Sequence, residues 1–283
     1  PFKDYWIIKG PVLDIVQAIF FKFFGVSWFS YAAHSSTFNS IFALGTFFTL
    51  RKFKLDLKYA FVYSALASVL MYPTYGTPFT DHHVSIFSML SIYSLCLAIK
   101  TKKNIYWFLI PILLFIGFFS KQTPIGYFGI LIGAISIIYF ILNFDIKNLI
   151  YIAVGTVLII SVFFILIFFY QIPIEDILIQ HFLFPISLGE SRLEWLLPFE
   201  FQRFVFRHKL IYIALSIPIF LLFKSIIKNF KTIFNHDNLI FILLLGTLLI
   251  FVSHQLMTIN GMFIFFLIPV FCGFSHVYSN SFK

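Results

Sequence analysis

Long apolar stretches alternate with short polar ones along the whole chain. A transmembrane helix needs about 20 mainly apolar residues, and most of these stretches approach that length. The pattern predicts an all-α fold, a polytopic transmembrane helix bundle with about nine spans. The predicted spans are Trp28–Leu50, Tyr59–Tyr72, Val84–Ile99, Ile105–Phe119, Ile125–Leu142, Leu149–Tyr170, Leu210–Phe223, Leu239–Val252 and Met262–Tyr278.

The first polar segment, residues 1–26, departs from this pattern. It opens with an aromatic loop and continues into Pro11–Phe24, an apolar stretch interrupted by Asp14, Gln17 and Lys22. The stretch is too short and too polar to span a bilayer. We therefore expect an external loop followed by an amphipathic helix that lies in the membrane interface.

The longest polar segment, residues 171–209, is rich in Glu, Arg, Trp and Pro. It predicts a second external loop, with a short helix around Ile174–Phe182. No separate soluble domain is evident, so we expect residues 1–283 to form a single transmembrane domain. The chain does not begin with Met, and we expect it to be a fragment that lacks at least one upstream transmembrane segment.

Composition supports a membrane protein and narrows the partners. The chain is 60% hydrophobic and 11% charged, with a mean hydropathy of +0.97, whereas soluble domains carry about 25% charged residues. A net charge of +9 would suit a nucleic-acid binder, but the basic residues cluster between apolar stretches, as in the positive-inside rule. No nucleic-acid partner is expected. Cys96 and Cys272 lie inside apolar stretches and predict packing, not metal binding.

Charge also predicts the orientation. Alternate polar loops differ in charge, and the strongly basic set is expected to be cytoplasmic. The basic residues of that set are Arg51, Lys52, Lys54, Lys58, Lys100, Lys102, Lys103, Lys147, Lys224, Lys228, Lys231 and Lys283, against the acidic Asp56, Asp145 and Asp237. The other set is expected to face outward. It holds the ionisable residues that are candidates for a functional site: Asp4, Asp14, Asp81, Lys121, Glu190, Arg192 and Glu194.

The sequence TPFTDHH, residues 77–83, is the most unusual feature of this outer set. An ionisable group beside hydrocarbon is costly and persists mainly at a wet cavity or a working site. Thr80 or Asp81 could cap the following helix, or Asp81 could bind a divalent cation or an acceptor hydroxyl. His82 and His83 point about 100° apart on a helix, so we expect one imidazole in the site, contacting substrate or, for His82, a metal.

A second candidate is SKQTP, residues 120–124, between the fourth and fifth predicted spans. Lys121 could reach out to lipid headgroups, or it could bind a phosphate as a point charge, with Gln122 beside it. Pro124 favours the start of the next helix.

The remaining candidates lie in loops. Arg192, flanked by Glu190 and Glu194, could form internal ion pairs or clamp a phosphate or sugar while a glutamate positions the acceptor. Asp4 beside Tyr5 and Trp6 resembles a carbohydrate contact, although interfacial aromatics are also common. His254, Gln255 and Asn260 are polar groups at the outer end of the eighth predicted span, where a polar turn is slightly favoured over a place in the site. The sequence contains no motif for nucleotide binding, serine hydrolysis or zinc proteolysis.

These motifs resemble a known family. The sequence PFKDYW…KGP with its amphipathic helix, then TDHH, then FFSKQTP is similar to the external loops of GT-C fold glycosyltransferases. That superfamily includes protein O-mannosyltransferases, the aminoarabinose transferase of lipid A and RgtA-type sugar transferases. In the family, the main catalytic acid lies early in the first external loop, and this chain opens later in that loop. The resemblance therefore makes Asp81 a supporting acid and Lys121 a contact of the lipid phosphate.

The resemblance implies an enzyme that transfers a hexose or pentose from a polyprenyl-phosphate donor to a lipid, glycan or protein acceptor, with inversion. It implies no cofactor, although a divalent cation would be compatible with Asp81. We expect an integral protein of the bacterial inner membrane with its site facing the periplasm or exterior. The alternatives are a lipid-linked oligosaccharide flippase or other transporter, an O-antigen-type polymerase, or a non-catalytic scaffold. A transporter would carry charged or broken helices near the bilayer midplane.

Overall fold

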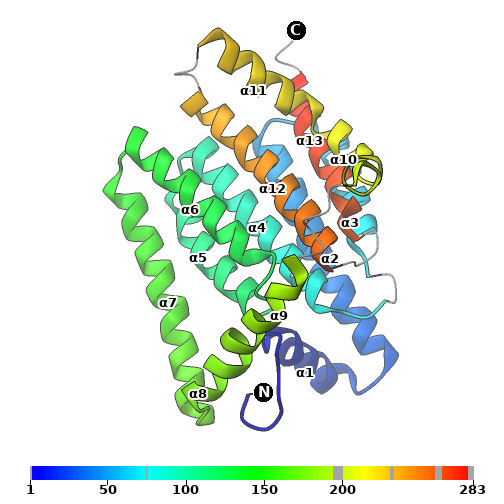
Figure 1. Cartoon of the computed structure of the whole chain (residues 1–283), viewed down its shortest axis with the longest axis vertical. Coiled ribbons are helices and arrows are strands. Elements are labelled where there is room, and N and C mark those ends of the chain that lie inside the picture. The colour runs from blue at the N-terminus through cyan, green and yellow to red at the C-terminus, as the bar shows by residue number, and fades with distance from the viewer. Residues whose placement is uncertain (1, 74–75, 194–199, 230–232, 259–262, 280–283) are drawn as a thin grey trace.

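The structure is a computed structural model of the whole chain (Figure 1). It describes residues 2–73, 76–193, 200–229, 233–258 and 263–279, without the side chains of residues 190–193 and 263. The fold is all-helical, with 83% of the chain in helices and no strand in the described parts. The predicted fold class is confirmed at this level.

The first half of the chain supplies the bundle. Its helices are α1 (Val12–Phe24), α2 (Trp28–Lys52), α3 (Leu57–Met71), α4 (Thr80–Thr101), α5 (Asn104–Phe118), α6 (Ile125–Leu142) and α7 (Ile146–Tyr170). Shorter segments follow. They are α8 (Ile174–Ile177), the π-helical η1 (Leu178–Leu183), α9 (Phe184–Leu193), the π-helical η2 (Gln202–Phe206), α10 (Lys209–Ala214) and α11 (Ser216–Lys228). The chain closes with α12 (His236–Thr258), the 3-10 turn η4 (Phe263–Phe266) and α13 (Leu267–Ser279).

Helix α4 is the centre of the bundle. It packs against α2, α5, α6 and α12. Of its apolar 18-residue stretch, 83% is buried inside the bundle. Serines recur on it at every third position, and all four are buried: Ser85, Ser88, Ser91 and Ser94. Small side chains let neighbouring helices approach closely. This explains why the most buried helix has a mean hydropathy of only 1.6, against 3.0 for α7.

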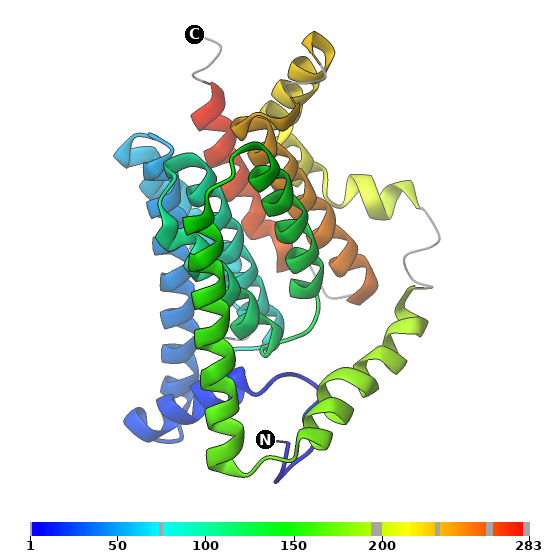
Figure 2. The ribbon, with the colours of Figure 1, turned by 90° about the vertical axis from the view of Figure 1, so that its left-hand side faces the viewer.

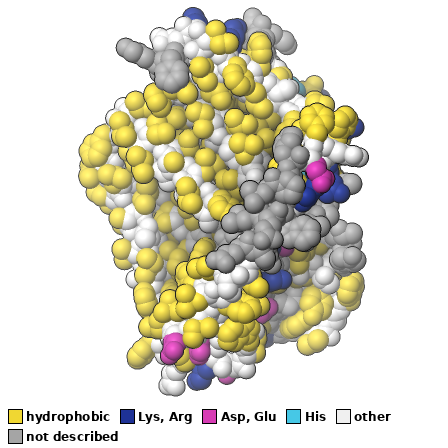
Figure 3. Space-filling model, viewed as in Figure 1, with side chains coloured by type: hydrophobic (Ala, Val, Ile, Leu, Met, Phe, Trp, Pro, Cys, Tyr) yellow, Lys and Arg dark blue, Asp and Glu magenta, His cyan; other side chains and the backbone are white. Residues whose placement is uncertain are grey.

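Helix α7 lies at the edge of the bundle. Only 11% of its apolar 18-residue stretch is buried, and apolar side chains such as Val157, Ile165 and Phe168 are exposed along the helix. Figure 2 shows α7 at the front of the bundle with α6 beside its upper part, and α8, η1 and α9 turning away from its lower end. On the face in Figure 3, hydrophobic side chains cover most of the surface, and charged ones gather near the two ends and along the right-hand side. Such an apolar belt suits contact with lipid.

Four described helices are long and apolar enough to cross a membrane: α4, α6, α7 and α12. Helices α3 and α5 and the segment Ile264–Ser279 are apolar but shorter. The predicted seventh span, Leu210–Phe223, is not one helix, because it breaks at Leu215 between α10 and α11. The structure thus gives a membrane protein with four candidate spans, fewer than the nine predicted.

The charged clusters at one end of the bundle contact each other across helices. Lys100, at the end of α4, donates a hydrogen bond to Asp237 Oδ1 at the start of α12 over 3.1 Å. Tyr278 on α13 donates to the same oxygen at 3.1 Å, and the Lys100 ammonium lies 5.6 Å from the Phe53 ring centre. We call this the lysine end. The opposite end, where α4 begins and α12 finishes, holds His34, His82, His83, His181 and His254 and is called the histidine end.

Two segments cover the histidine end. The predicted interfacial stretch forms α1, which lies across this end in Figures 1 and 2. The predicted short helix at residues 174–182 is part of a longer helical run, Ile174–Leu193. The predicted loop of residues 171–209 therefore contains more helix than expected, because most of its described part is helical.

Helices α5 and α7 meet through Gly155. A Cβ atom there would lie 2.3 Å from the carbonyl oxygen of Phe108 and 3.0 Å from Cγ of Pro111. We expect Gly155→Ala to lower the free energy of unfolding by about 2 kcal/mol, because the two helices must separate. Thermal unfolding in detergent measures this.

The matched control is Gly133→Ala on α6, where a Cβ atom meets nothing within 4 Å. Alanine favours a helix over glycine by up to about 1 kcal/mol, so this variant should be neutral or more stable. Equal effects of the two variants would contradict the close contact of α5 and α7.

Candidate functional site

Asp81 lies in the first turn of α4, and its carboxylate is held by side chains from two other segments. The helix begins at Thr80, and no side chain caps it. Asp81 Oδ1 instead accepts hydrogen bonds from Lys121 Nζ and, at 3.0 Å, from His254 Nε2. The capping interpretation of Asp81 was therefore wrong.

Lys121 lies in the turn between α5 and α6. It is only 9% exposed, and its ammonium forms an ion pair with Asp81. The side chain thus points into the bundle end, and the interpretation of Lys121 as a lysine that reaches out to headgroups was wrong. Pro124 precedes α6, as predicted, and the Thr123–Pro124 peptide bond is cis.

His254 completes this group from the last turn of α12. The polar-turn interpretation was wrong, because its imidazole is buried and bonded to the carboxylate. Removing charges from water costs several kcal/mol per ion, and a buried pair is retained only where the partners satisfy one another. Asp81, Lys121 and His254 meet this condition, with contributions from α4, the turn after α5, and α12. We call them the carboxylate group.

A row of three neutral side chains runs from α1 to α4. His34 Nδ1 donates to Gln17 Oε1 at 2.7 Å, which leaves His34 Nε2 without a hydrogen. His34 Nε2 and His83 Nε2 are hydrogen-bonded at 2.9 Å, and His83 Nδ1 lies 3.4 Å from the Phe79 carbonyl oxygen. The row Gln17–His34–His83 therefore links α1 through α2 to the helix turn that carries Asp81, and all three residues are buried.

His82 points away from this row. It is fully buried and stacks on Phe79 with ring centres 6.1 Å apart. Neither ring nitrogen has a hydrogen-bond partner among the described residues. The two adjacent imidazoles thus have different surroundings, as the helix geometry predicts. Within the described residues, no group of three or more His, Cys, Asp or Glu is placed to hold a metal ion.

The Gln122 side chain connects the turn after α5 to the N-terminal segment and to η1. Its Nε2, with two hydrogens, lies within hydrogen-bond distance of three acceptors: the Ile8 carbonyl at 2.8 Å, His181 Nδ1 at 2.8 Å and the His181 carbonyl at 2.9 Å. His181 is fully buried and stacks on Phe119 at 4.8 Å. Burial lowers the pKa of His181 to about 4, so the ring is neutral at pH 7. A substrate contact for Gln122 stays a prediction, since its amide already serves these partners.

The N-terminal segment is fixed to the same place by close backbone contact. A Cβ atom on Gly10 would lie 1.6 Å from the Phe119 carbonyl oxygen, so only glycine allows this approach. Val12 N donates to that oxygen at 3.2 Å. The end of α5 and the start of α1 are therefore held together beside Lys121.

Of the predicted residues Asp4, Glu190, Arg192, Glu194 and Asn260, the structure describes only the side chain of Asp4. Asp4 is exposed, and the structure gives it no hydrogen bond or ion pair within the described residues. Glu190 and Arg192 have their backbone in α9, which contacts α12, but their side chains lie outside the described residues. Glu194 and Asn260 lie outside them entirely.

Sequence reasoning overlooked His34, Gln17 and His181. His34 stands in YAAHSSTFNS, where polar residues recur inside a predicted span. That recurrence was the available signal, because buried polar groups in a membrane bundle must find partners. His181 carried no comparable signal, since its burial depends on α8 and η1 folding back towards the end of α5.

The histidine end can therefore offer an ionised carboxylate, an ammonium beside it and neutral imidazoles, all shielded from bulk water. Such a set can accept a proton from a hydroxyl and stabilise a developing negative charge. Searches of protein families, curated proteins and solved structures find no match to this chain.

The ion pair of Asp81 and Lys121 should be strongly coupled. We expect Asp81→Asn and Lys121→Met each to lower the free energy of unfolding by about 3 kcal/mol, because each leaves a buried charge without its main partner. The double variant should lose much less than the sum, as a thermodynamic cycle of unfolding in detergent would measure.

The matched control is the pair at the lysine end, where Lys100 and Asp237 have side chains 36% and 51% exposed. Their coupling should be below about 1 kcal/mol. Equal coupling at the two ends would mean that the Asp81 carboxylate is as well hydrated as that of Asp237.

The buried His181 predicts a dependence of stability on pH. Its pKa is about 4 in the fold and about 6.5 when unfolded. As pH falls from about 6.5 to 4, the unfolded chain takes up a proton that the folded chain does not, so stability falls by about 3 kcal/mol.

The variants His181→Gln and His181→Phe should both reduce this loss by a similar amount, although each changes stability at pH 7 for its own packing reason. Thermal unfolding between pH 7 and pH 4 tests this. An unchanged slope in both variants would show that the ring is not kept neutral by burial.

Proposed function

We propose that this protein is an integral membrane glycosyltransferase. It transfers a sugar from a polyprenyl-phosphate donor to a hydroxyl of a lipid, glycan or protein acceptor at the histidine end. The observation that carries the proposal is the buried Asp81 carboxylate, bonded by Lys121 and His254 at one end of an apolar bundle. A shielded carboxylate beside a cation suits a reaction that takes a proton from one substrate and releases a phosphate from the other.

Asp81 is the proton acceptor in this mechanism. The acceptor hydroxyl attacks the anomeric carbon of the donor while its proton passes to the carboxylate. The bond between the anomeric carbon and the phosphate oxygen breaks, and polyprenyl phosphate leaves with the electron pair. Attack opposite to the leaving group inverts the anomeric configuration. The proton on Asp81 then returns to water.

Lys121 stabilises the leaving group. An ammonium carries three N–H donors, so one cation can serve the carboxylate and a phosphate oxygen at once. The negative charge that develops on the phosphate increases this interaction in the transition state, which is the condition for catalysis. His254 keeps the carboxylate oriented from α12 and acts as a positioning residue. The proposal assigns no step to a metal ion.

An apolar groove beside Lys121 supports a lipid-linked donor. A hollow of about 620 Å³ lies between α5, α6, α7 and the segment α8–η1. Phe118, Phe119 and Ile125 line it on either side of the SKQTP turn. Gly126 and Gly129 place no side chain on the α6 wall of this groove. A Cβ atom at either position would project into open space, with no other atom within 4 Å. The polyprenyl chain of the donor is the occupant that we propose, with its phosphate directed to Lys121.

The charge pattern supports the orientation. The lysine end faces the cytoplasm and the histidine end faces outward, in agreement with the positive-inside rule. In this arrangement α2, the shorter helices α3, α5 and α13, and the broken segment α10–α11 cross the membrane with the four candidate spans, giving the nine spans, and α1 lies in the interface. We place the protein in the bacterial inner membrane. Glu190 and Arg192, on α9, remain proposed contacts of the substrates.

Asp81→Asn should decrease transfer about 100-fold or more, because the amide cannot accept the proton. The assay follows release of polyprenyl phosphate from a panel of polyprenyl-phosphate sugars by the protein in lipid nanodiscs. Thermal unfolding checks that the variant is folded. Lys121→Gln should raise KM for the donor and lower kcat, whereas Lys121→Arg should keep part of the activity.

Asp237→Asn is the matched control, because it removes a carboxylate paired with a lysine at the opposite end. It should change transfer less than about twofold. Full activity of a folded Asp81→Asn variant would remove Asp81 from the mechanism. Movement of an intact lipid-linked sugar across sealed proteoliposomes, without release of polyprenyl phosphate, would instead support a flippase.

A further inference from the structure

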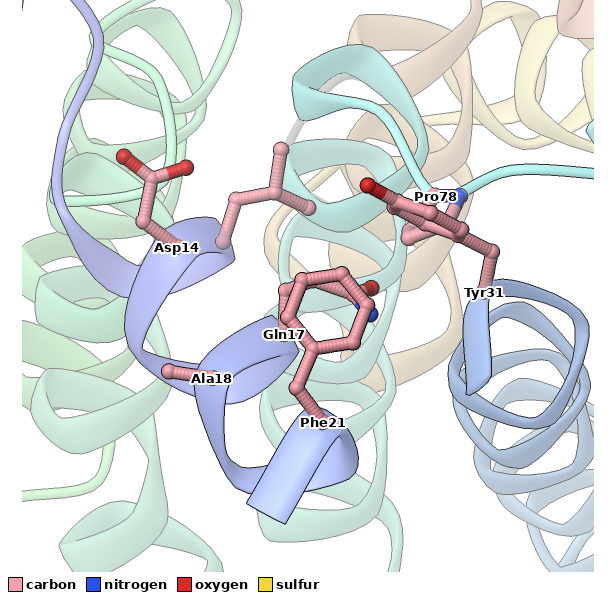
Figure 4. Close-up of a pocket in the computed structure, with 7 residues that line it drawn as sticks. Asp14, Gln17, Ala18, Phe21, Tyr31 and Pro78 are labelled. Atoms are coloured by element: carbon pink, nitrogen blue, oxygen red, sulfur yellow. The ribbon is translucent and has the colours of Figure 1, made fainter. Parts of the chain in front are cut away.

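A second hollow lies at the histidine end, between α1, the start of α2 and the segment before α4. It has a volume of about 320 Å³, and its lining residues are Leu13, Asp14, Gln17, Ala18, Phe21, Tyr31 and Pro78. In Figure 4, Gln17 and Phe21 lie between α1 and the side chains of Tyr31 from α2 and Pro78, whereas Asp14 and Ala18 lie towards the other side of α1. Small-ligand sites typically hold about 300–1,000 Å³, so this hollow suits one ring and not an extended chain.

Gln17 is the polar group at the base of this hollow. It is only 9% exposed, and its Oε1 is bonded to His34. Its Nε2 has no hydrogen-bond partner among the described residues. A buried amide N–H that lacks a partner costs about 1–3 kcal/mol. A ligand with an oxygen at this position would remove that cost.

The rim excludes one class of ligand. Asp14 brings a carboxylate to the lining, and Tyr5 donates a hydrogen bond to its Oδ2 at 2.8 Å. Burial, and then the bond to Asp14, raises the pKa of Tyr5 to about 12, so its hydroxyl stays protonated at pH 7. The carboxylate repels phosphates and carboxylates but accepts hydroxyl groups. The hollow is therefore unsuited to the charged part of a lipid-phosphate donor.

The walls favour a ligand with one apolar face. Phe21, Tyr31, Leu13 and Pro78 surround the polar groups of Gln17 and Asp14. A sugar ring has hydroxyls around its edge and C–H groups on its faces, so it matches an aromatic wall together with an amide and a carboxylate. A purely apolar ligand would leave the amide without a partner, and a small polar solute would leave the rings uncovered.

We propose that this hollow binds a neutral sugar unit. Gln17 donates to one ring hydroxyl, Asp14 accepts from another, and Phe21 or Tyr31 covers an apolar face of the ring. The row Gln17–His34–His83 connects the bound hydroxyl to the helix turn of Asp81. The assignment of this sugar as part of the acceptor rests on the proposed function; the binding of the sugar does not.

The test is equilibrium binding without any lipid-linked donor. Saturation-transfer NMR on the protein in nanodiscs is run with neutral monosaccharides (glucose, galactose, mannose and arabinose) and with glucose 6-phosphate. At least one neutral sugar should bind, and the phosphate should not. Gln17→Leu should raise the Kd about tenfold, because one hydrogen bond is lost. The control is the same change at an exposed position, Gln202→Leu, which should leave the Kd unchanged.

Ala18→Leu provides a second variant that keeps α1 intact, because leucine is a good helix former and Ala18 is exposed. Its side chain would fill the hollow and abolish binding, whereas Ala153→Leu on the exposed side of α7 should not. Binding of every neutral sugar unchanged in Ala18→Leu, or no binding to the native protein, would overturn the proposal. Sugar transfer with no sugar bound in this hollow would refute the subsite alone, and sugar binding without transfer would refute the proposed function alone.

Discussion

The cost of keeping charge out of water shapes the histidine end more than any other constraint. Asp81 lies in the first turn of the most buried helix, where a carboxylate alone would be strongly unfavourable. Lys121 and His254 offset this cost, and each must arrive from a different segment. The turn after α5 and the end of α12 are therefore held at the start of α4. The serines of α4 make room for the helices that bring them.

Neutral polar groups extend this arrangement towards the surface. Gln122 and His181 join the N-terminal segment and η1 to the turn that carries Lys121. Gln17, His34 and His83 join α1 to α4. In both sets an amide meets an imidazole, so polarity is satisfied without adding charge. The apolar groove is lined by Phe118, Phe119 and Ile125, on either side of the turn that carries Lys121 and Gln122. An apolar surface therefore lies directly beside a polar site.

The sequence was sufficient for the fold class and the opening of α4 at DHH, and it singled out Asp81 and Lys121, which the structure brings into one ion pair, because an ionisable residue beside apolar stretches is informative by itself. It was not sufficient for the partners. His254 lies far from Asp81 along the chain, and nothing in its local turn indicates the contact. The break at Leu215 was also missed, because hydropathy measures apolar content and not the continuity of a helix. The helical run after α7 was underestimated for a similar reason, since its stability depends on packing against Phe118 and Phe119.

The hydrogen bonds in the row of Gln17, His34 and His83 can run in either direction. Every bond in it joins groups that can exchange the roles of donor and acceptor. If the Gln17 amide turns over, it donates to His34 Nδ1, His34 Nε2 donates to His83, and His83 Nδ1–H faces the Phe79 carbonyl oxygen 3.4 Å away. The amide then presents oxygen instead of N–H to the hollow beside it. The direction of a whole line of dipoles can thus reverse with no net charge buried, and the hollow can match a ligand that donates as well as one that accepts.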